Sequence, residues 1–253
     1  MVEALFWPAL LAYGEAAFAY TSTRTTRLAI WGVRIGWLVQ TCLLAVQAAK
    51  ADGFPWATWG GSLNLFVWLV VGAYLIWGCR PRYRLLGLAV MPLAAVLFLV
   101  ARLAGATHGG RGEDGSNLFL AVHVGLVLSA FAGFTLAAGL AGLYLWQERR
   151  LKRRASDILR VRVPPLASLE RLAWRTIAVS APLLALGVAA GFVRARQEHR
   201  PLDALEAVTW LTLGVYAAIV LGRPSGRRLA YLALGGFVLV AVARLALAGS
   251  HVA

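Results

Sequence analysis

Residues 118–146 read LFLAVHVGLVLSAFAGFTLAAGLAGLYLW, an apolar run without a single Asp, Glu, Lys or Arg. A helix needs about 20 predominantly apolar residues to cross the hydrocarbon core of a bilayer. The apolar residues here are continuous, and they lack the period of a helix or strand that is half buried in a water-soluble protein. The run therefore predicts a transmembrane helix.

Similar runs occupy most of the rest of the chain, and hydrophobic residues make up 60% of its 253 positions. The eight predicted spans are Ala4–Tyr20, Leu28–Ala48, Gly60–Cys79, Arg84–Ala104, Leu118–Trp146, Ala173–Val193, Ala204–Gly222 and Leu229–Gly249. No polar or turn-rich stretch between them is long enough to link separate domains. We therefore expect an all-α polytopic membrane protein in which residues 1–253 form a single transmembrane helical domain.

The distribution of charge between the loops predicts the orientation. The loops after spans one, three, five and seven hold 16 Lys or Arg against three Asp or Glu, a balance of +13, and the other loops hold five against six, or −1. Because cytoplasmic loops are rich in Lys and Arg, the first set is expected inside and both termini outside a bacterial inner membrane. Anchoring of this kind, with anionic membrane lipid as the partner, accounts for the net charge of +14 without any nucleic acid.

The largest inner loop is the only one that is long enough to contact a cytosolic partner. It covers residues 147–172, and its start, QERRLKRR at 147–154, is expected to continue the fifth helix past the lipid headgroups.

Four histidines fall at or near the predicted outer face: His108, His123, His199 and His251. Imidazole is a common axial ligand of heme iron, and a site with two such ligands needs them at similar depth on different helices. His123 and His251 satisfy that condition. A histidine near a helix end is also often a hydrogen-bonded interface residue, and this alternative stays open for each.

Ionisable side chains within the spans are costly unless they are paired. Glu15 and Arg34 lie at similar depth on consecutive spans, so we expect an ion pair between them. Arg102 and Arg244 lie near the outer ends of spans four and eight, where a guanidinium can extend to the interface or grip the carboxylates of a ligand. Trp59, at the outer end of span three, fits an aromatic membrane belt and could also stack on a porphyrin.

Several motifs in this sequence resemble the CcsA and CcmC-type family of cytochrome c assembly proteins. They are Phe54-Pro55 with Ser62-Leu63 and Trp68; His123-Val124 with Tyr144-Leu145 and Gln147-Glu148-Arg149; Pro201, Asp203, Thr209-Trp210-Leu211 and Tyr216; and Gly226-Arg227-Arg228 through Gly249-Ser250-His251. The resemblance implies heme bound at the outer face, cradled by a tryptophan-rich loop and ligated by two flanking histidines. His123 and His251 take the ligand positions, and Trp210 belongs to what is left of the loop.

The chain also departs from that family pattern. The tryptophan-rich core of the loop is replaced by the charged segment Arg194–Arg200, and Ala217-Ala218 stands where a further histidine is expected. With these differences, the chain resembles the shorter HemX-like and YpjD-like branch of the family.

Three functions stay open on these grounds. The first is a heme-binding membrane protein of cytochrome c-type biogenesis, acting with a second assembly subunit or with apocytochrome c. The second is a regulator that binds no heme and controls a cytosolic enzyme of heme synthesis through the basic loop at 147–172. The third, a small-solute transporter, is the weakest, because matched spans interrupted by Gly and Pro are not evident. No nucleophile, phosphate-loop or paired-carboxylate motif predicts a self-contained catalytic site.

Overall fold

The structure is a computed structural model that describes residues 2–22, 24–50, 56, 58–77, 83–105, 118–153, 164–197 and 204–250. These residues contain eight helices and no strand: α1 (Val2–Ala19), α2 (Thr26–Lys50), α3 (Trp59–Trp77), α4 (Arg84–Leu103), α5 (Leu118–Lys152), α6 (Leu166–Gln197), α7 (Ala204–Gly222) and α8 (Arg227–Ser250). The prediction of an all-α protein is therefore confirmed.

Five helices in the described part of the chain are long and apolar enough to cross a membrane. They cover Thr26–Lys50, Trp59–Ile76, Leu85–Leu103, Leu120–Lys152 and Leu166–Arg196. The chain is thus a multi-pass membrane protein, while the count of eight spans and the external termini stay predictions. The expected extension of the fifth helix is confirmed, because α5 continues to Lys152.

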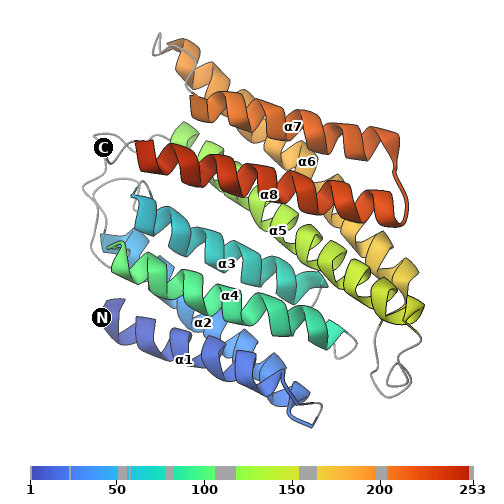
Figure 1. Ribbon diagram of the computed structural model, residues 1–253. Helices are drawn as coiled ribbons and strands as arrows, with labels where there is room; N and C mark the ends of the chain where they lie inside the picture. Colours follow the sequence, from blue (N-terminus) through green and yellow to red (C-terminus); the bar gives the residue numbers. More distant parts are fainter. Residues whose placement is uncertain are drawn as a thin grey trace. The chain divides into compact units, whose positions relative to one another are not determined.

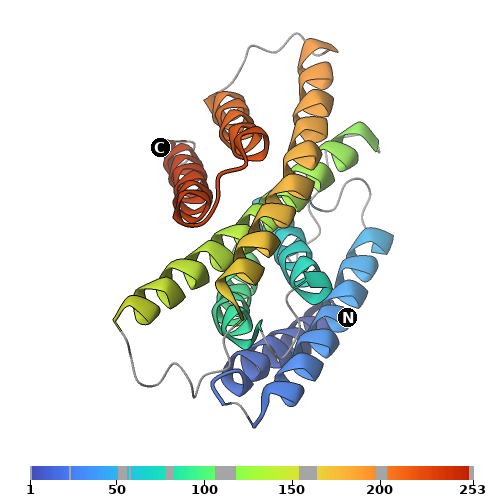
Figure 2. The ribbon, with the colours of Figure 1, turned by 90° about the vertical axis from the view of Figure 1, so that its right-hand side faces the viewer.

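The chain divides into two compact units, Met1–Leu118 and Phe119–Ala253. In the first unit α1 packs along α2 and α4, and α3 packs along α4 (Figure 1). In the second unit α7 packs against α6 and α8, and Figure 2 shows α7 and α8 side by side. The prediction that all the spans form one domain stays a prediction.

Small residues bring α1 and α2 close together in the first unit. Gly32 and Gly36 lie four residues apart on α2, and a Cβ atom at Gly36 would lie 2.7 Å from Cε1 of Tyr13 on α1. A Cβ atom at Gly32 would lie 3.2 Å from the carbonyl oxygen of Ala12. The G-x-x-x-G spacing is typical of transmembrane helices that pack backbone against backbone.

A chain of polar side chains holds α1, α2 and α3 together. The Tyr13 hydroxyl donates to Oε1 of Gln40 at 2.6 Å, and Nε2 of Gln40 donates to the backbone carbonyl of Asn64 at 3.1 Å and to its Oδ1 at 2.8 Å. Nδ2 of Asn64 then donates to Oε1 of Gln47 at 3.3 Å. The first three side chains are buried. A buried polar group without a partner is costly, so this chain fixes how the three helices meet.

The predicted ion pair between Glu15 and Arg34 is wrong. Both side chains are exposed, the Arg34 guanidinium lies 5.2 Å from the centroid of the Trp31 ring, and no ion pair joins Glu15 to another described residue. Equal depth does not place two side chains on facing sides of their helices. An ion pair forms instead between Arg102 of α4 and Glu3 of α1, with 2.5 Å between Nη2 and Oε1.

Aromatic stacking forms the centre of the second unit. The rings of Phe134 on α5 and Tyr216 on α7 lie nearly parallel, with their centroids 3.6 Å apart. The Tyr216 hydroxyl donates to the carbonyl oxygen of Ala233 on α8 at 3.4 Å. Both rings are buried, so three helices of the unit share this contact.

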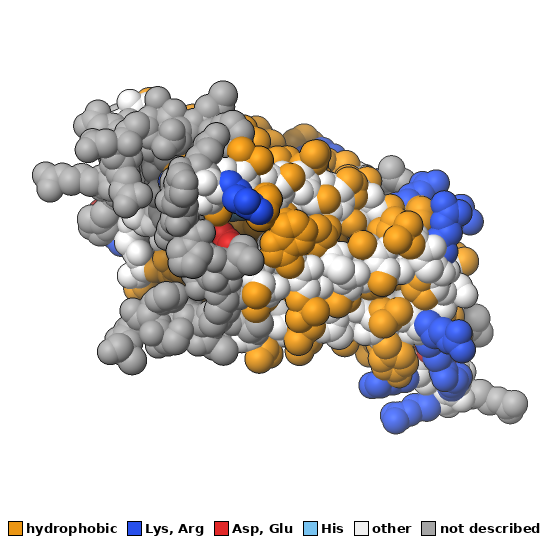
Figure 3. Space-filling view, turned by 90° about the horizontal axis from the view of Figure 1, so that it is seen from above, with side chains coloured by type: hydrophobic (Ala, Val, Ile, Leu, Met, Phe, Trp, Pro, Cys, Tyr) orange, Lys and Arg blue, Asp and Glu red, His pale blue; other side chains and the backbone are white. Residues whose placement is uncertain are grey.

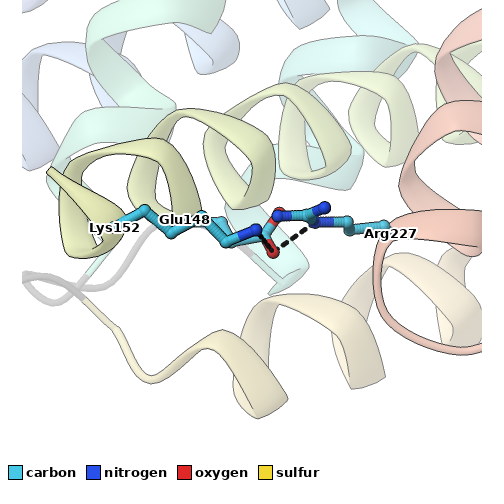
Figure 4. Close-up of polar contacts among 3 residues, drawn as sticks. All are labelled: Glu148, Lys152 and Arg227. Atoms are coloured by element: carbon cyan, nitrogen blue, oxygen red, sulfur yellow. Dashed lines mark hydrogen bonds and ion pairs between the residues drawn. The ribbon is translucent and has the colours of Figure 1, made fainter.

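The turn between α7 and α8 is held by two carboxylates. Glu148 on α5 accepts a hydrogen bond from Nε of Arg227 and lies 3.6 Å from Nζ of Lys152 (Figure 4). The backbone N–H of Gly226 donates to Oε1 of Glu170 on α6 at 2.9 Å. Gly226 has a φ of 58°, a left-handed conformation that glycine adopts without strain. These contacts tie the turn to the facing ends of α5 and α6.

Candidate functional site

His123 lies near the N-terminal end of α5, half buried against α6. Its Nδ1 is 2.6 Å from the carbonyl oxygen of Gly187. Gly191 makes room for the imidazole, because a Cβ atom there would lie 2.6 Å from Cε1 of His123. A Cβ atom at Gly187 would lie 2.8 Å from Cγ2 of Val127. Gly187 and Gly191 on α6 therefore form a G-x-x-x-G pair that leaves room for His123 and Val127, two side chains one turn apart on α5.

The contact with Gly187 assigns the tautomer of the neutral His123 ring. A carbonyl oxygen can only accept a hydrogen bond, so Nδ1 carries the proton and Nε2 carries the lone pair. Among the described residues, none donates a hydrogen bond to Nε2. Histidines that ligate metals almost always donate their other ring N–H to a carbonyl, a carboxylate or water. The donor set at His123 therefore fits an axial ligand of heme iron.

A second arrangement lies between the adjoining ends of α6 and α7. Trp210 on α7 meets Phe192 on α6 edge to face, with ring centroids 6.3 Å apart and an interplanar angle of 85°. The guanidinium of Arg196 lies over the Phe192 ring, 5.0 Å from its centroid. We call Phe192, Arg196 and Trp210 the α6–α7 ledge. All three side chains are exposed, so the ledge offers aromatic surface next to a positive charge.

Sequence reasoning singled out Trp210 but missed Phe192 and Arg196. The two lie four residues apart at the end of α6, a spacing that places side chains on one face of a helix. Arg196 lies in the charged segment Arg194–Arg200 that replaces the tryptophan-rich loop, and Phe192 lies two residues before that segment. Gly187 and Gly191 were missed as well, although their G-x-x-x-G spacing is a recognised packing signal.

The other predicted site residues lie either outside the described part of the chain or in the first unit. His251 lies outside the described residues, as does the side chain of Arg244 on α8. Trp59 belongs to the first unit, at the start of α3, and is 61% exposed. The pairing of His123 with His251 therefore stays a prediction. Within the described ranges, no group of three or more His, Cys, Asp or Glu could hold a metal ion.

The opposite end of the second unit is basic. Figure 3 shows Lys and Arg side chains gathered at one end of the visible face, with hydrophobic side chains along its length. The acidic groups there are already engaged, Glu148 by Arg227 and Lys152 and Glu170 by the backbone of Gly226. Within the described residues at this end, the basic side chains at the end of α5 therefore outnumber the acidic ones.

Comparison with known proteins finds a matching family model and several relatives. A family model described as "Cytochrome C assembly protein" matches residues 56–249. The protein HemX of Brevibacillus brevis is 27% identical over 208 residues, which cover 79% of this chain and 75% of that protein. The cytochrome c biogenesis protein CcsA of Guillardia theta is 25% identical over 227 residues, with coverages of 79% and 75%. That of Microcystis aeruginosa is 24% identical over 272 residues, with coverages of 85% and 82%.

The family match begins at residue 56, just before α3, and ends within α8, so that it covers well over half of the chain. The matched range includes His123 with its neighbours Gly187 and Gly191, and it also includes the α6–α7 ledge. The resemblance to the CcsA family and its HemX-like branch is thereby confirmed. The chain is a multi-pass membrane protein that belongs to the cytochrome c assembly protein family.

Proposed function

We propose that this protein binds heme at the outer membrane face, with His123 as an axial ligand, and that it serves cytochrome c-type biogenesis in a bacterial inner membrane. Family membership supports a role in cytochrome c biogenesis. The hydrogen bond between Nδ1 of His123 and the carbonyl of Gly187 is the observation that carries heme binding. It leaves the lone pair on Nε2 for a metal.

Heme, when bound, would supply a redox-active iron that needs nitrogen or sulfur ligands. Gly187 holds the proton of His123 at Nδ1 and orients the ring, and Gly191 gives the ring its space. His251, beyond the last described residue of α8, is the proposed second ligand. Arg244 is proposed to bind the heme carboxylates, since a guanidinium can grip a carboxylate through two hydrogen bonds. The proposed partners are a second assembly subunit or apocytochrome c.

The test is the heme content of the purified protein after expression with added heme. His123→Ala should reduce the retained heme and move the Soret maximum, and imidazole in the buffer should restore part of both by filling the vacant position. His108→Ala is the matched control, because His108 is predicted to lie in a glycine-rich outer loop outside the site. Wild-type protein that retains no heme, or a spectrum unchanged by His123→Ala, would contradict this function.

A regulatory role is the second candidate, and the similarity to HemX favours it. In this case the basic end of α5, with Arg149, Arg150 and Lys152, and Arg153 directly after it, would contact a cytosolic enzyme of heme synthesis. Glutamine at all four positions should abolish co-purification of such an enzyme and leave heme content unchanged. Unchanged co-purification, or none with the wild-type protein, would argue against regulation through this segment.

A further inference from the structure

Two ionisable side chains stand on the outward faces of α1 and α2. Glu15 and Arg34 are both exposed, and no ion pair joins either of them to another described residue. The Trp31 ring lies 5.2 Å from the Arg34 guanidinium, but an aromatic ring does not neutralise its charge. α2 is long and apolar enough to cross a membrane, and α1 packs along it. Because an ionisable group that faces hydrocarbon is costly and normally paired, each of the two charges needs an opposite charge.

The packing of α1 on α2 points the two side chains in different directions. Gly32 faces α1, and Arg34 follows it by two residues, so Arg34 lies about 200° round α2 from the α1 side. Ala16 contacts Gly32, and Glu15 precedes Ala16 by one residue, so Glu15 lies about 100° round α1 from the α2 side. The body of α2 therefore separates the two charges within one copy of the chain.

The two groups nevertheless lie at similar depth. A Cβ atom at Gly32 would lie 3.2 Å from the carbonyl oxygen of Ala12 and 3.3 Å from Cβ of Ala16. Gly32 is therefore level with the turn of α1 that contains Glu15, and Arg34 lies about 3 Å further along α2. Side chains lean toward the N-terminal end of their own helix, and α1 and α2 run in opposite directions, so the two charged groups lean toward a common level.

A second copy of the chain supplies both missing charges. Two copies inserted in the same orientation can be related by a twofold axis along the membrane normal, and rotation about this axis keeps every residue at its own depth. In such an interface each contact occurs twice, once in each direction. Glu15 of each copy can therefore meet Arg34 of the other. A different membrane protein would have to bring both an acid and a base to matching positions.

We propose that the protein forms a symmetric dimer through the outward faces of α1 and α2, with Glu15 of each copy paired to Arg34 of the other. Exposed apolar side chains of α2 surround the ion pairs and keep lipid and water away from them; they are Trp31, Ile35 and Leu38. The family model begins at residue 56, so this surface lies outside the range that it matches. The dimer does not depend on the proposed heme site.

The experiment measures association of the full chain in phosphatidylcholine liposomes. Copies labelled at the C-terminus with a donor or an acceptor fluorophore are mixed, and energy transfer is followed as added lipid dilutes the protein. The wild-type protein should dimerise reversibly, and stepwise photobleaching should count two copies. A monomer at every protein-to-lipid ratio, or an assembly of more than two copies, would overturn the proposal without any variant.

Neutral variants test the two charges separately. Glu15→Gln and Arg34→Gln should each weaken the dimer at least about fivefold, because each leaves a charge of the other copy without its partner in the membrane. Arg27→Gln is the matched control, because Arg27 is exposed on the same side of α2, two turns before Arg34 and at the start of the helix. It should keep the affinity within about twofold of wild type. Glu15→Gln or Arg34→Gln variants that associate as well as this control would contradict the pairing.

Charge reversal tests whether the two residues meet each other. Copies with Glu15→Arg carry arginine at both positions and copies with Arg34→Glu carry glutamate at both, so neither should associate alone. A mixture of the two should form a heterodimer within about threefold of the wild-type affinity, since every acid then faces a base. A misfolded variant cannot regain association by mixing. If the mixture stays monomeric while both variants unfold at the wild-type temperature, the pairing is refuted, and if the reversals misfold, the neutral variants decide.

Discussion

The imidazole of His123 lies directly against Gly191, so close that a methyl group on that glycine would come within 2.6 Å of Cε1 and 2.9 Å of Nδ1. The contacted atoms belong to a rigid ring rather than to the end of a flexible chain. The ring is also held by its hydrogen bond to Gly187 on the same face of α6. It therefore cannot yield to a larger residue without losing that bond.

Gly191→Ala should displace the imidazole, lower the retained heme several-fold and destabilise the protein by about 1–3 kcal/mol through overpacking. Heme content and thermal unfolding in detergent measure the two effects. Gly214→Ala on α7 is the matched control, because no atom lies within 4 Å of the added Cβ. It should be neutral or stabilise the helix by up to about 1 kcal/mol. Normal heme retention in Gly191→Ala would show that the observed ring position is not needed for ligation.

Gln40→Leu should destabilise the first unit by about 1–3 kcal/mol, because it leaves the Tyr13 hydroxyl and the Asn64 carbonyl without their partner in a buried position. Thermal unfolding or denaturation in mixed micelles gives the change. Gln47→Leu, at the less buried end of the same series of hydrogen bonds, should lower the free energy of unfolding by a smaller amount. Equal losses for the two variants would argue that the hydrogen-bonded chain contributes little to stability.

Gly226→Ala should lower the free energy of unfolding by about 1–2 kcal/mol, measured by thermal unfolding in detergent, because the φ of 58° at this position is strained for any residue with a Cβ atom. Gly235→Ala on α8 supplies the comparison, since nothing lies within 4 Å of its added Cβ. Glu170→Gln should cost less than Gly226→Ala, because the amide oxygen can still accept from the Gly226 N–H. If Gly226→Ala leaves the free energy of unfolding unchanged, the turn between α7 and α8 can relax to accommodate the Cβ atom.

A reporter fused after Ala253 should be external, and one inserted near Ser156 should be cytoplasmic. The reason is the loop balance of +13 against −1. Alkaline phosphatase and green fluorescent protein fusions read the two sides independently. A cytoplasmic C-terminus would remove the basis for placing His123 and His251 at one membrane face.

The sequence predicted the helices well because apolar run length and flanking charge depend on the bilayer, which is the same for every membrane protein. It could not predict which side of each helix faces its neighbour. Lipid and protein interior are both apolar, so continuous runs carry little information about rotation. The error at Glu15 and Arg34 arose in this way. Phe192 and Arg196 were missed because their contacts depend on how α6 and α7 meet.

His123 was found because a chemically distinctive residue stands out in an apolar run and matches a family motif. The two glycines that pack against its ring were harder to predict, since glycines occur throughout the chain and only the approach of another helix shows which ones are needed. Gly187 and Gly191 acquire their role from α5, which is far away in sequence.

The hydrogen bonds from Tyr13 to Gln47 all run in one direction, each residue donating to the next. Gln40 also donates to the backbone carbonyl of Asn64, an atom that can never become a donor. Rotating the Gln40 amide would therefore set two oxygens against each other, and the order of donors cannot reverse. An acid of the same shape is no full substitute: the carboxyl of Gln40→Glu has one O–H group to donate when protonated and none when ionised, whereas the amide donates to both oxygens of Asn64. The first unit therefore depends on the chemical asymmetry of one amide group.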